Sequence, residues 1–268
     1  MPVAQGTAPE GTALREARAT RYLLALREGG SLPGLVEADD LGTYVVKFHG
    51  AGQGRKALVA EVVVGELARR LDLPVPELVL VHLDASLASL EPDEEVQDLL
   101  RASHGLNLGV DFLPGSVGIE RPDGFDPDLA ARALWLDALT QNVDRSWRNP
   151  NLLRWHRSPW LIDHGAALYF HHDWSTRATA ATRPYPATAD HVLLPVAGPL
   201  APVQEALSPR VPEALAASLA LVPDGWLVDE PGFADADAVR AAYAEVLLAR
   251  LARPEAWLSA VEVARADL

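Results

Sequence analysis

The spacing of apolar residues divides the chain into a strand-rich first part and a helix-rich second part. Between residues 13 and 27 apolar side chains recur near helical spacing, which predicts a first helix that ends before a pair of glycines. The extended run Gly34–Glu37 and the β-branched and aromatic run Thr43–Phe48 flank a set of turn residues, and together they predict a β-hairpin. Lys47 therefore lies on a predicted strand.

Four further elements are predicted before the middle of the chain. They are a helix, a strand, the start of a short helix and a second strand, over Lys56–Leu71, Glu77–Leu83, Glu91–Asp98 and Gly105–Phe112. The turn Leu113–Gly115 then interrupts the pattern. We take this turn as the boundary between an N-terminal lobe of residues 1–113 and a C-terminal lobe of residues 114–268.

Helical periodicity dominates the second part. A strongly apolar helix is predicted over Asp126–Thr140, and two late helices are predicted over Asp235–Leu251 and Glu255–Ala266. Short extended runs occur only at Asn151–Trp155 and Trp160–Asp163. The predicted fold class is therefore α+β, with a β-rich N-terminal lobe and a mostly helical C-terminal lobe.

Composition excludes several classes of function. The chain has 268 residues, no cysteine and a formal net charge of -14. An acidic protein without clustered lysine and arginine is a poor match for the phosphate backbone, so we expect no nucleic-acid partner. The absence of cysteine excludes thiolate metal sites and cysteine nucleophiles. No apolar stretch approaches the roughly 18 residues that cross a bilayer, so we expect no membrane span and a cytoplasmic location.

The strongest chemical signal is a polar loop followed by a short apolar run. The loop contains Asp144 and, five residues later, Asn149, and the apolar run ends in Asp163-His164-Gly165. Phosphoryl transfer needs hard oxygen ligands that hold magnesium against phosphates, and these side chains supply such oxygens. Gly165 allows a sharp turn after the aspartate. The pattern therefore predicts transfer of a phosphoryl group.

A second group of residues in the first part matches a nucleotide site. Lys47 lies on a predicted strand and Glu61 lies in the following helix, an order typical of a lysine that binds phosphates and is held by a carboxylate. Upstream, the glycine-rich stretch Gly29–Gly34, with Gly30 and Ser31, would cover the phosphates with backbone N–H groups.

Several segments together resemble a stand-alone HipA-like kinase domain. They read Gly-Ser-Leu-Pro, Tyr-Val-Val-Lys-Phe, Ala-Glu-Val-Val-Val-Gly-Glu-Leu-Ala, Leu-Pro-Val-Pro-Glu, Asn-Val-Asp-Arg-Ser-Trp-Arg-Asn-Pro-Asn-Leu-Leu and Ile-Asp-His-Gly, and they cover roughly residues 29–165. The resemblance implies a two-lobed protein-kinase-like fold that binds ATP and Mg²⁺ between its lobes. Val143 stands where ordinary protein kinases have a histidine, which favours the HipA or lipid-kinase branch.

The resemblance also implies a role for each candidate residue. Asp144 would be the catalytic base, and Asn149 and Asp163 would bind the metal. Lys47 would bind the ATP phosphates, with Glu61 as its partner. We expect the backbone of the predicted strand to hold adenine, at Val110 and Phe112. The acceptor is an unidentified hydroxyl, which a protein serine or threonine, a lipid head group or a small alcohol would each supply.

Other interpretations of the same residues remain open. A pseudokinase would keep the fold and bind nucleotide without turnover. A metal-dependent hydrolase would use His164, His171, His172 and Asp173, although their spacing matches no zinc signature and we expect these histidines to face solvent. Taken singly, Asp144 could cap a turn and Glu61 could face solvent.

Overall fold

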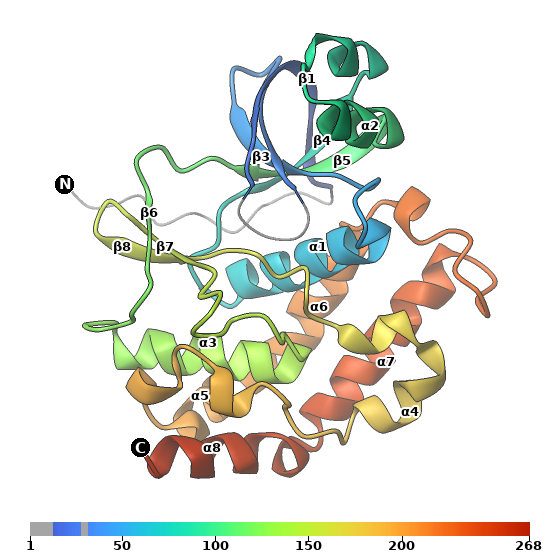
Figure 1. Cartoon of the computed structure of the whole chain (residues 1–268). Helices are drawn as coiled ribbons and strands as arrows, with labels where there is room; N and C mark the ends of the chain where they lie inside the picture. Colours follow the sequence, from blue (N-terminus) through green and yellow to red (C-terminus); the bar gives the residue numbers. More distant parts are fainter. Residues whose placement is uncertain (1–12, 28–31) are drawn as a thin grey trace. The chain divides into compact units, whose positions relative to one another are not determined.

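The computed structural model describes residues 13–27 and 32–268, and it has a mixed α+β fold (Figure 1). The chain divides into two compact units. The first unit contains the described residues up to Val59 together with Pro76–Pro114, and the second contains Ala60–Val75 and Gly115–Leu268. The dividing point after Val59 falls inside helix α1 (Gly54–Arg70). A lobe boundary at residue 113 stays a prediction.

Five strands of the first unit form a closed barrel in the order β1-β2-β3-β5-β4. The strands are β1 (Arg15–Ala25), β2 (Gly34–Ala38), β3 (Thr43–Lys47), β4 (Leu78–Leu83) and β5 (Gly105–Asp111). The predicted hairpin and the two later strands are confirmed. Strand β1 pairs antiparallel with β2 and parallel with β4, so it occupies the position that closes the barrel. Closure leaves none of these strands with an unpaired edge.

The predicted first helix is wrong, because residues 15–25 form strand β1. Alanine, arginine, leucine and glutamate favour helix in isolation, but the two neighbouring strands offer backbone hydrogen bonds along both edges of this segment. Register shifts near Ala19 and Tyr22 disturb the alternation of inward and outward side chains. This disturbance hides the strand period in the sequence.

The barrel is filled by side chains that alternate along its strands. Its buried cluster comprises Ala17, Val36, Ala38, Tyr44, Val46, Phe48, Val79, Val81 and Leu83, with Leu87, Ala88, Val96 and Leu100 from the segment that includes helix α2 (Glu94–Ala102). Lys47 lies between the buried residues Val46 and Phe48 and therefore points to the other face of the sheet. The period of two thus directs this lysine away from the core.

The second unit is mostly helical. Its helices after α1 are α3 (Pro127–Thr140), α4 (Arg177–Ala180), α5 (Leu200–Leu207), α6 (Val211–Ala220), α7 (Ala236–Leu251) and α8 (Leu258–Ala266). A small antiparallel sheet is formed by β6 (Val117–Gly118), β7 (Leu152–Trp155) and β8 (Ser158–Leu161), in that order. Among the described residues, no helix is long and apolar enough to cross a membrane.

In the second unit, helix α3 packs against α5, α7 and α8. Asp126 caps its first turn by accepting a hydrogen bond from the N–H of Leu129, and Pro127 occupies its first position. Most of its remaining side chains are buried, which a helix surrounded by other elements requires. The indole of Trp135 meets that of Trp257 edge to face, with ring centroids 6.0 Å apart.

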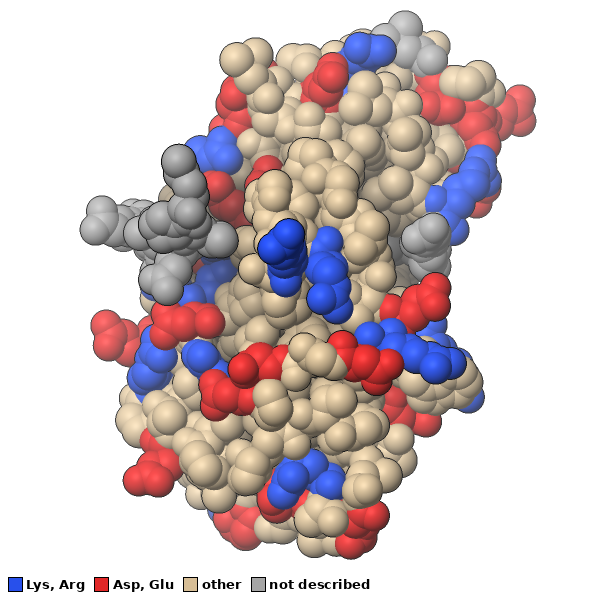
Figure 2. Space-filling model, turned by 90° about the vertical axis from the view of Figure 1, so that its left-hand side faces the viewer, with Lys and Arg blue, Asp and Glu red and all other residues tan. Residues whose placement is uncertain are grey.

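Charged side chains of both signs are scattered over the face drawn in Figure 2. On the face drawn in Figure 2, Lys and Arg side chains are interspersed with Asp and Glu side chains, and no extensive basic patch is present on that face. The expectation that the protein has no nucleic-acid partner stays a prediction.

We predict that Gly109→Ala destabilises the barrel. A Cβ added at Gly109 would lie 2.6 Å from Cγ2 of the buried Val81 and 3.2 Å from Cβ of Tyr44. Both neighbours are packed in the core, so the free energy of unfolding should fall by about 1–3 kcal/mol in urea denaturation. Gly52→Ala is the matched control, because nothing lies within 4 Å of a Cβ added there. Equal stability of the two variants would contradict the close packing inside the barrel.

Candidate active site

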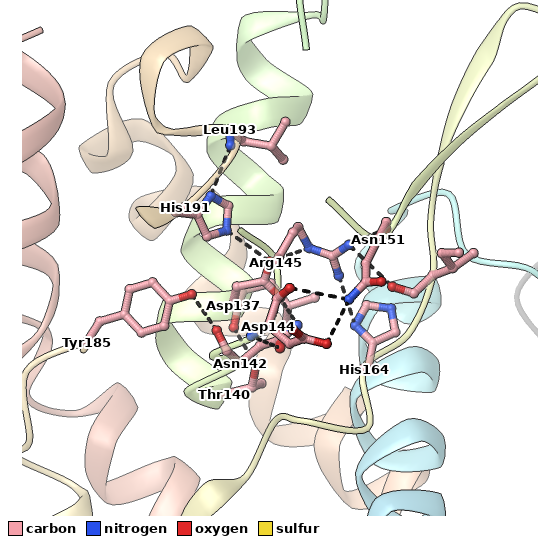
Figure 3. Close-up of polar contacts among 12 residues, drawn as sticks. Asp137, Thr140, Asn142, Asp144, Arg145, Asn151, His164, Tyr185, His191 and Leu193 are labelled. Atoms are coloured by element: carbon pink, nitrogen blue, oxygen red, sulfur yellow. Dashed lines mark hydrogen bonds and ion pairs between the residues drawn. The ribbon is translucent and has the colours of Figure 1, made fainter. Parts of the chain in front are cut away.

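The polar loop after helix α3 carries two of the predicted site residues. Gln141 has a φ of 57° and ends the helix in the left-handed conformation. The amide Nδ2 of Asn149 donates a hydrogen bond of 2.8 Å to Oδ2 of Asp144. A second amide, that of Asn151, donates to the same oxygen at 3.3 Å. The loop therefore folds back so that two amides hold one carboxylate oxygen. Figure 3 shows the contact of Asn151 with Asp144.

Asp163 follows strand β8 by two residues. Its φ of 56° lies in the left-handed region, where a residue other than glycine is strained. Burial raises the pKa of the partly buried Asp144 carboxyl, and the negative charge of Asp163 raises it further, whereas the amides of Asn151 and Asn149 oppose the shift. Asp163 is thus close enough for its charge to act on Asp144.

A buried aspartate at the end of helix α3 organises this loop. Asp137 is fully buried, and its Oδ1 accepts a hydrogen bond of 2.9 Å from Nδ2 of Asn142. Its Oδ2 accepts hydrogen bonds from Nε of Arg145 at 2.6 Å and from Nε2 of His191 at 3.1 Å. Burial alone would disfavour the charged carboxylate, but Arg145 and the hydrogen bond from His191 hold the pKa of Asp137 well below its usual range.

Arg145 connects Asp137 to the residue just before strand β7 and to the residues just after strand β8. Arg145 is 1% exposed, and its Nη1 donates to the carbonyl oxygens of Asn151 at 2.6 Å and Ile162 at 3.3 Å. Its Nη2 lies 3.3 Å from Nδ1 of His164. One buried cation therefore holds Asn151, whose amide binds Asp144, and the residues on either side of Asp163 (Figure 3).

Residues 185–193 form hydrogen bonds with the backbone of the loop. The hydroxyl of Tyr185 donates a hydrogen bond of 2.5 Å to the carbonyl oxygen of Asn142. The backbone N–H groups of Trp147 and Val192 bond to the carbonyls of Asp190 and Arg145 at 3.1 and 3.2 Å. Burial, followed by the charge of Asp137, raises the pKa of the Tyr185 hydroxyl, so this residue stays a neutral donor.

The predicted nucleotide-binding residues belong to several elements. Lys47 ends β3 opposite Leu108 of β5, and Val110 pairs with both neighbouring strands of the barrel. The N–H of Phe112 donates to the carbonyl of Thr43 at 3.0 Å. Glu61 lies in α1 and is 2% exposed, so the interpretation that it faces solvent is wrong. Gly30 and Ser31 lie outside the described residues, and the roles of all these residues stay predictions.

The structure gives the four residues of the rival metal hypothesis different surroundings. His164 faces Arg145, and Nδ1 of the buried His171 lies 2.9 Å from the hydroxyl of Tyr243. His172 is exposed, and the carboxylate of Asp173 accepts hydrogen bonds from Ser175. The expectation of solvent-facing histidines is therefore wrong for His164 and His171. Within residues 13–27 and 32–268, no group of three or more His, Asp or Glu side chains is arranged to hold a metal ion.

Asp137, Arg145 and His191 were not singled out from the sequence. Asp137 carries a signal that could have identified it, because it is an isolated acid in the apolar run Ala-Leu-Trp-Leu-Asp-Ala-Leu. An acid at such a position is buried and needs a partner, and the neighbouring loop contains an arginine. His191 carries no such signal, because its contact with Asp137 joins residues 54 positions apart.

We predict that Asp137→Asn strongly destabilises the protein. The change removes the counter-charge of a buried guanidinium while keeping the shape of the side chain, so the free energy of unfolding should fall by about 3–5 kcal/mol. Urea denaturation measures this loss. The control is Glu205→Gln on the exposed side of α5, which should change stability by less than about 0.5 kcal/mol. A loss no larger than that of the control would show that the ion pair does not stabilise the loop.

We also predict that His191 makes stability depend on pH. Burial lowers the pKa of His191 below its usual 6.5, although Asp137 opposes the shift, and Arg145 adds to it. The unfolded chain therefore takes up this proton first, and the contribution of His191 is complete above pH 6.5 and lost as the pH falls. Replacement by Gln should make the decline between about pH 7 and pH 5.5 shallower by up to about 1.4 kcal/mol per pH unit. Identical urea-unfolding profiles of parent and His191→Gln over this range would contradict the prediction.

Comparisons with known proteins agree on the class of fold. A family model described as HipA-like kinase matches residues 22–260. The chain also resembles the crystal structure of the Helicobacter pylori proinflammatory kinase CtkA, with 11% sequence identity and a TM-score of 0.50 over 95% of this chain and 98% of that chain. No curated protein matches the sequence significantly. The structural likeness shows a kinase fold, and the family match, which spans most of the chain, shows that this protein belongs to the HipA-like kinase family.

Proposed function

We propose that this protein is an ATP-dependent kinase that transfers the γ-phosphoryl group of ATP to a hydroxyl group. The observation that carries the proposal is the arrangement of Asp144, whose Oδ2 is held by two amides while the charge of Asp163 acts on it. A carboxylate held in this way is suited to orient a hydroxyl and to accept its proton. Membership of the HipA-like kinase family and the kinase fold support the same reaction class.

The proposed reaction assigns Asp144 to the acceptor. The acceptor oxygen attacks the γ-phosphorus as the bond between this phosphorus and the β–γ bridging oxygen breaks, so that ADP leaves. The proton of the hydroxyl passes to the carboxylate of Asp144. Asn149 and Asn151 hold Oδ2 of this carboxylate, which fixes its orientation before the acceptor arrives.

The donor set around Asp144 fits a divalent cation. Asp163 contributes a carboxylate. Asn149 uses its Nδ2 to hold Asp144, so the side-chain oxygen Oδ1 of Asn149 is the atom that can bind a metal. The raised pKa of Asp144 reflects in part the neighbouring charge of Asp163, and a cation would offset this concentration of negative charge. Mg²⁺ prefers such oxygens, and when bound it would neutralise charge on the phosphates of ATP. We therefore propose Asn149 and Asp163 as the metal ligands.

The remaining candidate residues would bind the nucleotide. We propose that Lys47 binds the phosphates with Glu61 as its partner, that Gly30 and Ser31 cover the phosphates, and that the backbone at Val110 and Phe112 holds adenine. Lys47 suits this role because its strand position directs it away from the barrel core. The acceptor hydroxyl belongs to a protein, a lipid head group or a small alcohol.

The two aspartates should respond differently to the same substitution. Asp163→Asn removes a charged metal ligand and should weaken magnesium-dependent binding of ATP as well as turnover. Asp144→Asn leaves the metal ligands in place and should lower ATP consumption by roughly 10² to 10⁴ while ATP affinity hardly changes. Calorimetry measures binding and a steady-state assay of ADP formation measures turnover.

The outcomes separate an active kinase from a pseudokinase. Near-normal turnover of Asp144→Asn, or unchanged magnesium-ATP binding by Asp163→Asn, would show that the roles are wrongly assigned. A parent protein that binds ATP with Mg²⁺ but forms no ADP would identify a nucleotide-binding module instead of a kinase.

A further inference from the structure

We propose that His191 is a positioning residue of the phosphotransfer site, which acts on Asp144 through Asp137 and the loop between them. The proposal rests on the proposed function, because it concerns the speed of the transfer step. His191 lies 28 residues after Asp163 in the sequence. Its ring nitrogens contact Asp137 and Leu193, and neither of these residues is a proposed metal ligand. Its effect must therefore pass through other residues.

Both ring nitrogens of His191 have a defined partner. Nε2 lies 3.1 Å from Oδ2 of Asp137, and Nδ1 accepts a hydrogen bond of 3.2 Å from the N–H of Leu193. Because Nδ1 accepts, the neutral ring carries its proton on Nε2 and donates it to the carboxylate. The side chain is fully buried, so no water competes for either contact. The ring is thus held in one orientation between its own segment and helix α3.

The backbone around His191 is also joined to the loop. Ser146 and His191 form an isolated antiparallel β-bridge. On its two sides, the N–H of Trp147 donates to the carbonyl of Asp190, and the N–H of Val192 donates to the carbonyl of Arg145. The side-chain contact and the bridge therefore fix the same stretch of chain, which begins one residue after Asp144.

Two routes lead from Asp137 to Asp144. In the first, Nδ2 of Asn142 binds Asp137 while Oδ1 of Asn142 accepts the backbone N–H of Asp144 at 3.2 Å. In the second, Nε of Arg145 shares Oδ2 of Asp137 with His191. Nη1 of Arg145 holds the carbonyl of Asn151, and the amide of Asn151 binds Oδ2 of Asp144. Loss of the donor from His191 would free Oδ2 to turn toward Arg145 and would shift both routes. A displacement of about 1 Å at a reacting group can lower a rate on the order of 10²-fold.

A pair of amide substitutions separates the two contacts of the ring. The side chain of Asn reproduces the reach of Nδ1, so His191→Asn can accept from Leu193 but cannot reach Asp137. The side chain of Gln extends to the position of Nε2, so His191→Gln can donate to Asp137. Tyr243→Phe is the control for stability alone, because it removes a buried hydrogen bond to His171, and the ring of Tyr243 packs against Phe170, His171 and Trp174.

We expect His191→Asn to lower kcat for ATP consumption on the order of 10²-fold without changing the Kd for magnesium-ATP. His191→Gln should restore kcat to within a few-fold of the parent, and Tyr243→Phe should leave it unchanged. If His191 only stabilised the fold, His191→Asn would lower the unfolding temperature, as Tyr243→Phe should, but its kcat would not differ from that of His191→Gln. Equal kcat values for the Asn and Gln variants would overturn the proposal.

Hydrogen exchange tests the proposal independently of turnover. The backbone N–H groups of Trp147 and Val192 should exchange faster in His191→Asn than in the parent or in His191→Gln, whereas exchange within α7 should not change. If the parent forms no ADP, the proposed kinase function fails, and the exchange rates still decide whether His191 holds the loop. Unchanged exchange at both positions would overturn the positioning role.

Discussion

The buried ion pair between Asp137 and Arg145 is the interaction on which the site depends. Two charges removed from water are stable only when their geometry and their remaining hydrogen bonds are satisfied. Asp137 meets this demand with donors from Asn142, Arg145 and His191, and Arg145 meets it with carbonyls from Asn151 and Ile162. The partners come from the loop after α3, from the residues after β8 and from the segment around His191. The requirement to pair two buried charges therefore brings these segments together.

The pair determines where the proposed site residues lie. The loop turns its buried residues toward Asp137, so the neighbouring side chains of Asp144 and Asn149 remain partly or fully accessible. Asn151 and Asp163, with φ values of 50° and 56°, are held in the left-handed region next to the two carbonyls that Arg145 binds. Strain at such positions persists only where surrounding contacts impose it. The site combines a rigid buried scaffold with accessible oxygen atoms.

The sequence predicted the elements whose signals are local. A β-branched and aromatic run identified the strand that carries Lys47, and a continuous apolar run identified α3. The strand that carries Val110 was also predicted. Strand β1 was missed because its partners are distant in sequence and its bulges disturb the alternation. The loop motif pointed to Asp144, Asn149 and Asp163, whose oxygens have a recognisable spacing. His191 could not be predicted, because only the folded chain brings it to Asp137.

The central claim is that the chain binds ATP together with a divalent metal through its own oxygen ligands. Thermal unfolding of the intact protein with ATP, measured with and without Mg²⁺ or Mn²⁺, tests this claim most directly, because a ligand that binds the native state raises its unfolding temperature. The account predicts a clear rise with ATP and metal together and a smaller rise with either alone. No response to ATP with either metal would contradict it.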